Sequence, residues 1–283
     1  MAEIRRYGII FASDETDPDK AYRILDDVEK FIDGIKIGIT ATVIVGSNLI
    51  RRIRKTFDKP VIADFKIADI GFREDSQWQG TNSKIVEELA EAGADYITCH
   101  AFPGIGSLQE SVEVAHQHGT KVFTLPSMTP PDSELFFRHP LDQAYSSKIL
   151  EKYGYPSELL KNATTFSDLI LNIGEFLNVD GYIGPANLYE NGKLVAIERY
   201  RQFTKKPIFS PGIGRQTTES LSLQNQLLNF YRAAGSDSAA IVGSSIYEDK
   251  FPRNVAFDFF RWRDAAEKQL ELVKKTKKKS AGE

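Results

Sequence analysis

Short apolar runs alternate with amphipathic segments along most of this chain of 283 residues. Each run has the length of one β-strand and is apolar at successive positions, as in strands that are buried on both faces of a parallel sheet. Glycine, proline and aspartate residues bound most of the runs and favour turns there. The predicted strands span residues 7–13, 35–37, 61–66, 95–100, 121–125, 181–184, 207–210 and 239–243.

Helical patterns lie between these strands. Pro18 opens a helix with apolar side chains at helical spacing, and Gly93 and Gly119 end the helices predicted over residues 81–92 and 107–118. Further helices are predicted over residues 47–57 and 254–273. Eight strands alternating with helices predict an α/β fold of the (β/α)8 TIM-barrel type. A doubly wound parallel sheet is the alternative.

Residues 1–273 are predicted to form one barrel domain, because no linker or internal repeat divides the pattern. Two insertions interrupt the alternation of strands and helices. One is polar and covers about residues 71–80, and the longer one covers residues 126–179 and contains two extra helical segments. Both follow the carboxyl ends of strands, where barrel enzymes keep their active sites. Residues 274–283 are rich in lysine and are predicted to be a flexible basic tail.

Composition excludes several classes of partner. A formal net charge of -3 gives no reason to expect nucleic acid or an anionic membrane as a partner. The one cysteine, Cys99, excludes an internal disulfide and a multi-cysteine zinc site, and it lies in an apolar run that favours a buried, inert thiol. With no apolar run of membrane-spanning length and no signal-peptide pattern, we expect a cytoplasmic protein.

Three charges interrupt the apolar stretch over residues 61–70. Asp64 and Lys66 are two positions apart, so in a strand they point to the same face, and Asp69 follows shortly after. Burying an acid and an amine among apolar side chains costs several kcal/mol unless the two are paired. The stretch is therefore either a buried structural ion pair or part of an active site.

Two more charges, Asp14 and Lys36, stand at the ends of the first two predicted strands. In a barrel these positions converge on one mouth with Asp64 and Lys66. An alternating array of acids and amines neutralises itself, so each member can stay ionised despite partial burial. Lys36 alone could be a barrel-filling lysine that reaches outward to water. Together the charges favour an active site.

These residues resemble a known family. The motif Asp64-x-Lys66-x-x-Asp69-Ile70, preceded by Lys36, is similar to that of orotidine 5'-monophosphate decarboxylase in its archaeal form. Two glycine motifs, over residues 210–214 and 241–247, extend the resemblance to all eight strands. The resemblance implies a homodimeric barrel, without cofactor or metal, that converts orotidine monophosphate to uridine monophosphate and carbon dioxide.

The resemblance also implies roles for the charged residues. Asp64 would face the substrate carboxylate, and Lys66 would stabilise the carbanion at pyrimidine carbon 6 and protonate it. Asp69 would enter the partner subunit's site, hold Lys66 and touch the ribose. Asp14 and Lys36 would bind ribose hydroxyls and complete the charge network. The physics agrees, because a carbanion without a cofactor needs a preorganised cation in a site that excludes water.

The glycine motifs predict the phosphate site. Loops after strands seven and eight of barrels often bind phosphate through backbone N–H groups. The family places an arginine where this chain has Ser244. A charge-assisted hydrogen bond contributes about 1.5–3 kcal/mol, so its loss predicts roughly 10- to 150-fold weaker transition-state binding. Arg215 is our candidate replacement. The residues predicted to contact substrate are Asp14, Ile70, Thr81, Thr129, Pro211, Gly212, Gly214, Arg215, Gln216, Gly243 and Ser244.

Thr129 is predicted to contact the pyrimidine on the strength of an alignment through Met128, with Ser127 as the alternative.

Two rival functions remain. Related sugar-phosphate decarboxylases and synthases use magnesium, but they carry a carboxylate near the position of Lys36, and a lysine there would repel the metal. A barrel that binds a nucleotide without turning it over is the other rival. Charges so costly to bury argue against binding alone.

Overall fold

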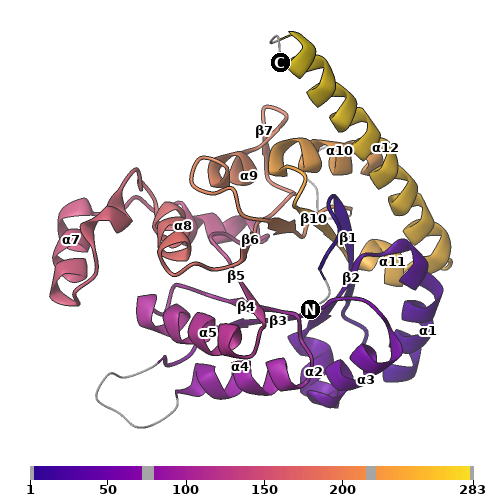
Figure 1. Ribbon diagram of the computed structural model, residues 1–283, viewed down its shortest axis with the longest axis horizontal. Helices are drawn as coiled ribbons and strands as arrows, with labels where there is room; N and C mark the ends of the chain where they lie inside the picture. The colour runs from indigo at the N-terminus through magenta and orange to yellow at the C-terminus, as the bar shows by residue number, and fades with distance from the viewer. Residues whose placement is uncertain (1–2, 72–79, 215–220, 281–283) are drawn as a thin grey trace.

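The computed structural model describes residues 3–71, 80–214 and 221–280 (Figure 1). Eight strands form a closed, parallel barrel in the order β1-β2-β3-β4-β5-β6-β9-β10. The strand β10 pairs with β1, Gly8 opposite Ala239, and this pairing closes the sheet. The predicted TIM barrel is therefore confirmed, and the doubly wound alternative is excluded. The strands are β1 (Gly8–Ser13), β2 (Gly34–Gly38), β3 (Val61–Ile67), β4 (Tyr96–Cys99), β5 (Lys121–Thr124), β6 (Gly181–Ile183), β9 (Ile208–Ser210) and β10 (Ala239–Val242).

Helices surround this barrel, and local sequence explains several of their ends. Asp17 caps the first helix by accepting hydrogen bonds from the backbone N–H groups of Asp19 and Lys20. The helices of the first half are α1 (Pro18–Val28), η1 (Glu29–Phe31), α2 (Ile39–Val45), α3 (Asn48–Thr56), α4 (Thr81–Glu91) and α5 (Ile105–Gln117). Those near the C-terminus are α9 (Val195–Tyr200), α10 (Leu223–Ala234), α11 (Ser244–Tyr247) and α12 (Pro252–Ser280). A short hairpin, β7 (Tyr189–Glu190) and β8 (Lys193–Leu194), precedes α9.

Apolar side chains fill the barrel interior. The rings of Phe123 and Phe209 lie 4.3 Å apart between centroids, and Tyr96 packs edge-on against Phe123. Ile10 and Ile62 belong to the same buried cluster. This packing makes the barrel a filled core rather than a pore. Polar groups are therefore left to the ends of the strands.

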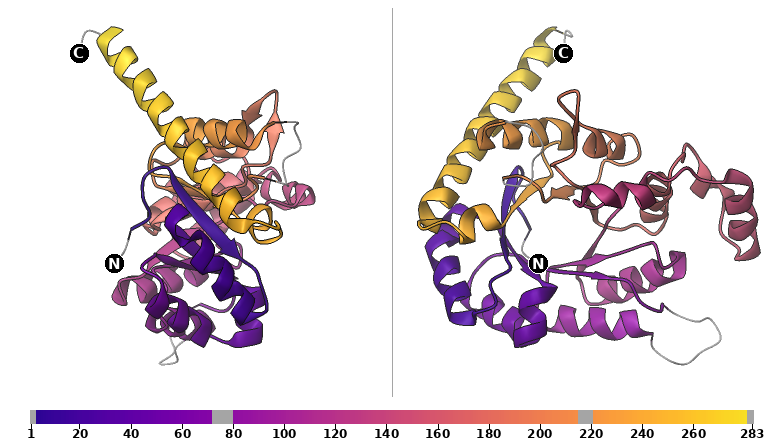
Figure 2. Two further views of the ribbon diagram at one scale, coloured as in Figure 1. Left: turned by 90° about the vertical axis from the view of Figure 1, so that its right-hand side faces the viewer. Right: turned by 180° about the vertical axis from the view of Figure 1, so that it is seen from behind.

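The connection from β5 to β6 carries the longer insertion. It contains η2 (Pro131–Ser133), α6 (Glu134–Phe137), α7 (Gln143–Lys152) and η3 (Ser157–Leu160), followed by α8 (Phe166–Phe176). Helix α7 projects away from the barrel, whereas α8 leads back into β6 (Figures 1 and 2). A capping box between Thr165 and Asp168 begins α8. Of the two extra helical segments expected here, the second thus serves as the crossover helix.

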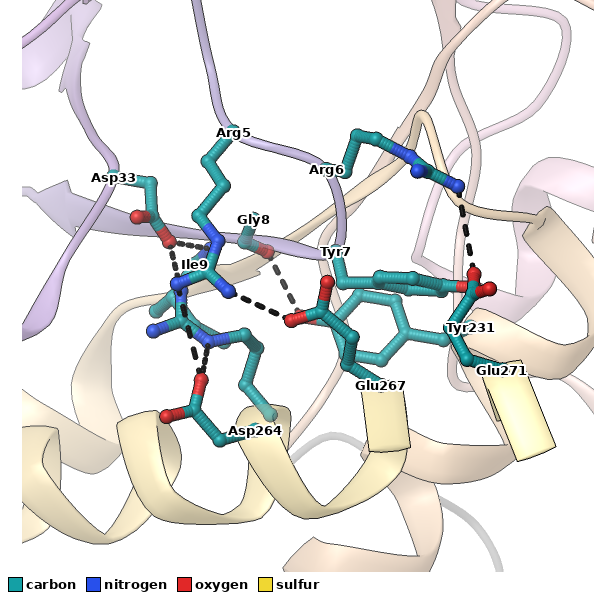
Figure 3. Close-up of polar contacts among 11 residues, drawn as sticks. Arg5, Arg6, Tyr7, Gly8, Ile9, Asp33, Tyr231, Asp264, Glu267 and Glu271 are labelled. Carbon is teal, nitrogen blue, oxygen red and sulfur yellow. Dashed lines mark hydrogen bonds and ion pairs between the residues drawn. The ribbon is translucent and has the colours of Figure 1, made fainter. Parts of the chain in front are cut away.

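Helix α12 is tied to the amino end of β1 by polar contacts (Figure 3). Arg263, with 1% of its surface exposed, donates to Asp33 Oδ2 at 2.7 Å, and that oxygen also accepts the backbone N–H of Ile9. Arg5 contacts Glu267 at 2.7 Å. The helix continues to Ser280, so residues 274–280 are helical where the sequence predicted a flexible tail.

None of the helices in the described part of the chain combines the length and apolar character needed to cross a bilayer. Cys99 is fully buried, as its apolar run predicted. Burial raises the pKa of its thiol to about 12, so the thiolate nucleophile is not formed at neutral pH.

Candidate active site

A cavity of about 260 Å³ opens at the carboxyl ends of the strands. Its floor is apolar and belongs to the barrel core, and its walls carry the predicted charges. Because every strand of a parallel barrel ends at the same mouth, residues far apart in the sequence meet there. The predicted site residues among its lining are Asp14, Lys36, Asp64, Lys66, Thr129, Pro211, Gly212, Gly243 and Ser244.

Four charges form a continuous row across this cavity. Lys36 Nζ lies 2.9 Å from Asp64 Oδ2, and Lys66 Nζ lies 2.8 Å from the same oxygen. Lys36 Nζ is also 3.8 Å from Asp14 Oδ1. The acid–amine alternation expected from the sequence is thus present within one chain for four of its five members.

Burial and the neighbouring charges shift the pKa values of Asp64 and Lys36 in opposite directions. Burial alone would raise the pKa of Asp64, but the ammonium groups of Lys36 and Lys66 outweigh it and hold that pKa well below its ordinary value. Burial alone would lower the pKa of Lys36, yet Asp64 and Asp14 raise it overall. Asp64 is therefore a carboxylate, and Lys36 an ammonium, at neutral pH.

A glycine makes the approach of Asp14 to Lys36 possible. Gly38 ends β2, and a Cβ atom built on it would lie 2.5 Å from Asp14 Oδ1. Any other residue there would push the carboxylate away from the row. The glycine that bounds this strand in the sequence thus has a role in the site as well as in the turn.

The charged stretch of β3 is irregular. Lys66 has a φ of 50°, a left-handed conformation that is uncommon for a lysine. Its backbone N–H donates to Thr98 Oγ1 on β4 at 2.9 Å, and the same hydroxyl donates to Asp64 Oδ1 at 2.9 Å. Sequence reasoning missed Thr98, because threonine is a common strand residue and an apolar run gives no signal for it.

The loops after β9 and β10 form the opposite end of the cavity. Gly212 has a φ of 97°, and a Cβ atom on it would meet Asn187 at 3.0 Å, so the chain requires glycine there. Ser244 begins α11 directly after Gly243. Ser245 and Tyr247 also line the cavity and were not predicted as site residues, although they lie in the motif that was recognised.

Gly214 does not fit its predicted role. Its backbone N–H donates to Gln226 Oε1 at 2.9 Å, and Gln226 Nε2 donates to the carbonyl of Leu221. The expected phosphate donor is therefore already paired within the protein. Arg215 and Gln216 lie outside the described residues. Among the described lining residues, the only cationic side chains are Lys36 and Lys66.

The loop after β5 forms a further wall, through Ser127, Met128 and Thr129. The Ser127 hydroxyl shares a hydrogen bond of 2.5 Å with the hydroxyl of the buried Tyr200. The carbonyl of Thr129 accepts a hydrogen bond from Asn187. Both candidates for the pyrimidine contact, Thr129 and Ser127, therefore line the cavity.

Besides Gly214, three more of the described predicted site residues do not line the cavity. Asp69 is exposed, and its Oδ1 accepts the backbone N–H of Ile70 at 2.6 Å rather than pairing with Lys66. Ile70 is 65% exposed. Thr81, the first residue of α4, is exposed and does not line the cavity. In a single chain, the charge row therefore ends at Lys66.

His100 follows β4 behind the row and is buried. Within the described residues its Nδ1 atom has no hydrogen-bond partner. Burial, assisted by the charge of Lys66, lowers its pKa to about 4, so the ring is neutral at neutral pH. Its ring packs against Phe102. These features are typical of a histidine packed in the core of a barrel.

The donor set of the cavity does not suit a divalent cation. Both oxygens of Asp64 already accept hydrogen bonds, from Lys36 and Lys66 on one side and from Thr98 on the other. Lys36 occupies the position at which the magnesium-dependent rivals carry a carboxylate. No group of three or more potential metal ligands occurs among the residues that the structure describes. The charges available to a ligand in this cavity are therefore those of the chain's own side chains.

A closed (β/α)8 barrel with a partly buried row of acids and amines at its mouth defines an α/β-barrel enzyme site. The family model described as "Orotidine 5'-phosphate decarboxylase / HUMPS family" matches residues 8–259, and the chain belongs to this family. The resemblance drawn from the sequence motifs is confirmed.

Curated relatives from archaea agree with this assignment. The chain is 30% identical over 250 residues to orotidine 5'-phosphate decarboxylase of Methanosphaera stadtmanae, covering 87% of this chain and 92% of the relative. It is 31% identical over 252 residues to the Methanosarcina acetivorans protein of the same name, covering 89% and 92%. The family and these relatives make the chain a carboxy-lyase.

Solved structures support the fold. The Methanocaldococcus jannaschii orotidine 5'-monophosphate decarboxylase complexed with inhibitor BMP superposes with a TM-score of 0.70 at 24% identity, covering 90% of this chain and 97% of that one. KGPDC from Streptococcus mutans in complex with D-R5P gives a TM-score of 0.59 at 17% identity, covering 93% and 98%. At these identities the matches establish the barrel alone.

Proposed function

We propose that the protein decarboxylates orotidine 5'-monophosphate to uridine 5'-monophosphate in cytoplasmic pyrimidine biosynthesis. The observation that carries the proposal is the row Asp14–Lys36–Asp64–Lys66 at the barrel mouth, in a chain of this family. A substrate with a carboxylate beside a carbon that becomes a carbanion needs both signs of charge at one point, and Asp64 with Lys66 supplies them.

Lys66 is the proposed proton donor. As the bond between carbon 6 and the carboxylate breaks, carbon dioxide leaves and the electron pair stays on carbon 6. The Lys66 ammonium stabilises that charge and then transfers a proton to it, giving uridine monophosphate. Its side chain is 36% exposed, so it can reach a ligand, while Asp64 at 11% stays fixed beneath it.

Asp64 orients Lys66 and faces the substrate carboxylate. A second carboxylate placed near Asp64 raises the energy of the bound substrate, and this repulsion is lost when carbon dioxide departs. Lys36 keeps Asp64 ionised from the other side, and Asp14 extends the row towards the position proposed for the ribose. The buried pair of Lys36 and Asp64 therefore stays charged without outside counterions.

The phosphate is proposed to lie against Pro211, Gly212, Gly243 and Ser244, with Thr129 contacting the base. Backbone N–H groups and serine hydroxyls suit phosphate oxygens. Our hypothesis remains that Arg215 supplies the cation that the family places at Ser244. Comparison of Arg215→Ala with the parent protein tests it, and an unchanged Michaelis constant and turnover rate would reject it.

The active form is proposed to be a homodimer in which Asp69 enters the partner's site. Asp69 and exposed apolar side chains follow the adjacent strands β2, β3 and β4 on the same end of the barrel. Those side chains are Ile39, Val43, Ile70 and Phe102. Exposed apolar groups gathered at one end are typical of a subunit interface.

Mixing two inactive variants tests the shared site. Asp69→Ala and Lys66→Ala homodimers should each be inactive, whereas a mixture contains hybrid dimers with one intact site. Recovery of activity on mixing, together with a dimeric mass by light scattering, is the expected result. A monomeric, active protein would contradict the proposal.

The proposed reaction is tested by adding orotidine monophosphate to the purified protein and following its absorbance, with product identified by chromatography. We expect complete conversion to uridine monophosphate, and the same rate after treatment with a chelator. Loss of activity with chelator would favour the magnesium-dependent sugar-phosphate branch. Tight binding of uridine monophosphate without turnover would favour the nucleotide-binding barrel.

A further inference from the structure

The pairing of β3 with β4 is interrupted where the charges stand. Ala63 pairs with Ile97, and Ile67 pairs with Cys99. Between these pairs β3 has Asp64, Phe65 and Lys66, whereas β4 has Thr98 alone. The stretch of β3 that carries the charges is therefore a bulge, a feature that re-aims side chains at a functional site.

A bulge removes regular ladder hydrogen bonds, and here one side chain replaces them. Thr98 Oγ1 accepts from the backbone N–H of Lys66 at 2.9 Å and donates to Asp64 Oδ1 at 2.9 Å. Thr98 borders the cavity, but its side chain is fully buried and its hydroxyl is directed to these two partners. Its one hydroxyl thus serves as acceptor for one of the two residues and as donor for the other.

The backbone of Lys66 needs such support. Its φ of 50° is unfavourable for a residue with a side chain, and it persists only where the surroundings hold it. The two lysine ammonium groups both contact Asp64 Oδ2, so Thr98 is the described partner of Oδ1. Thr98 therefore holds the Oδ1 side of the carboxylate, while the two lysines hold the Oδ2 side.

We propose that Thr98 is the positioning residue of this active site, holding the Lys66 backbone in its left-handed conformation and the Asp64 carboxylate in its orientation. It acts through these two residues rather than on the substrate. The inference rests on the proposed function for its kinetic consequence, but its structural part stands on the hydrogen bonds alone.

Three substitutions separate this role from a packing role. Thr98→Val keeps the shape and removes the hydroxyl, whereas Thr98→Ser keeps the hydroxyl and removes the methyl group. The matched control is Thr124→Val, because Thr124 is an equally buried threonine on neighbouring β5 whose hydroxyl has no hydrogen-bond partner among the described residues. A general cost of losing a barrel hydroxyl would appear in the control too.

Kinetics with orotidine monophosphate give the first readout. Loss of a hydrogen bond to a charged group predicts that Thr98→Val lowers kcat about 10- to 100-fold. The dissociation constant of uridine monophosphate should change less than about threefold, since the loops that bind the product are untouched. Thr98→Ser should recover kcat to within a few-fold, and Thr124→Val should match the parent. An unchanged kcat in Thr98→Val would overturn the inference. A kcat in Thr98→Ser as low as that in Thr98→Val would also overturn it.

Amide hydrogen exchange at Lys66 gives a second readout that needs no turnover. Its N–H should exchange at least about tenfold faster in Thr98→Val than in the parent, with protection restored in Thr98→Ser. Equal protection in all three proteins would overturn the inference. If the parent protein fails to turn over orotidine monophosphate, the proposed function fails, and the exchange measurement still decides the role of Thr98.

Discussion

Lys36 Nζ lies 2.9 Å from Asp64 Oδ2 in a place where each residue exposes 8% of its surface. The two side chains come from neighbouring strands, which pair Gly38 opposite Asp64. A buried pair of this kind adds little to stability, because desolvation of both charges offsets their attraction. In the proposed function, the pair keeps a carboxylate ionised beside the substrate.

Removal of one member of this pair should destabilise the protein more than removal of both. Asp64→Leu leaves Lys36 buried with Asp14 only, and it should lower the free energy of unfolding by about 3–5 kcal/mol. The double variant Lys36→Met/Asp64→Leu should recover most of that loss while remaining inactive. Urea denaturation measures both. A double variant no more stable than Asp64→Leu would show that the pair is not coupled.

The pH dependence of stability should carry a contribution from His100. Its pKa of about 4 in the folded protein lies below the ordinary value of 6.5, so the unfolded chain binds the proton more readily. The stabilisation is complete above pH 6.5 and is lost as the pH falls towards 4, by about 3 kcal/mol in all. Asp64, whose pKa is lowered too, stabilises above its ordinary pKa of 3.8 and loses this effect only at lower pH.

The variant His100→Gln isolates that contribution. Between pH 7.5 and pH 4.5, the parent should lose about 2–3 kcal/mol more unfolding free energy than the variant. Chemical denaturation at the two pH values provides the comparison. Equal losses of unfolding free energy in both proteins would mean that His100 takes up a proton as readily in the folded protein as in the unfolded chain.

At the opposite end of the barrel, Arg263 should matter for stability and not for catalysis. Its guanidinium is buried against Asp33 and Asp264. Arg6, by contrast, is 58% exposed in its contacts with Asp237 and Glu271, the second of which is drawn in Figure 3. Arg263→Met should cost about 3–5 kcal/mol, and the matched Arg6→Met less than about 1 kcal/mol. Thermal denaturation and kcat of the folded protein would check this. A fall in kcat for Arg263→Met would contradict the assignment.

Gln226 should affect the proposed phosphate end of the site. It is 2% exposed and joins Gly214 to Leu221 through both ends of its amide. Gln226→Leu removes both hydrogen bonds and should raise KM for orotidine monophosphate about tenfold. The reaction of orotidine, which lacks the phosphate, should keep its kcat/KM. An equal loss with both substrates would point to a general packing defect.

The strands were predictable because each is a separate apolar run, and all eight occur where those runs stand. Helix α2 was not, because Ile39–Val45 is rich in β-branched residues and lacks a side-chain cap. The helical content of the C-terminal lysine segment was likewise missed. The run of lysines suggested a flexible tail, but the segment is the continuation of the long helix α12.

The charge row was predictable because strand ends converge in a barrel and burial makes unpaired charges costly. Asp14, Lys36, Asp64 and Lys66 therefore meet as expected. Thr98 could not be predicted, since its role depends on a bulge that periodicity does not reveal. The internal pairing of Gly214 depends on a helix residue in another part of the chain, so its motif alone was misleading.

The rate of uridine monophosphate formation by Lys66→Ala, relative to the parent, tests the central claim most directly. The parent should convert orotidine monophosphate fully, and the variant should be slower by about 10⁴-fold, because both the cation and the proton donor are lost. Calorimetry should show that the variant still binds uridine monophosphate. A variant that turns over within tenfold of the parent, or a parent that binds the nucleotide without releasing carbon dioxide, would contradict the account.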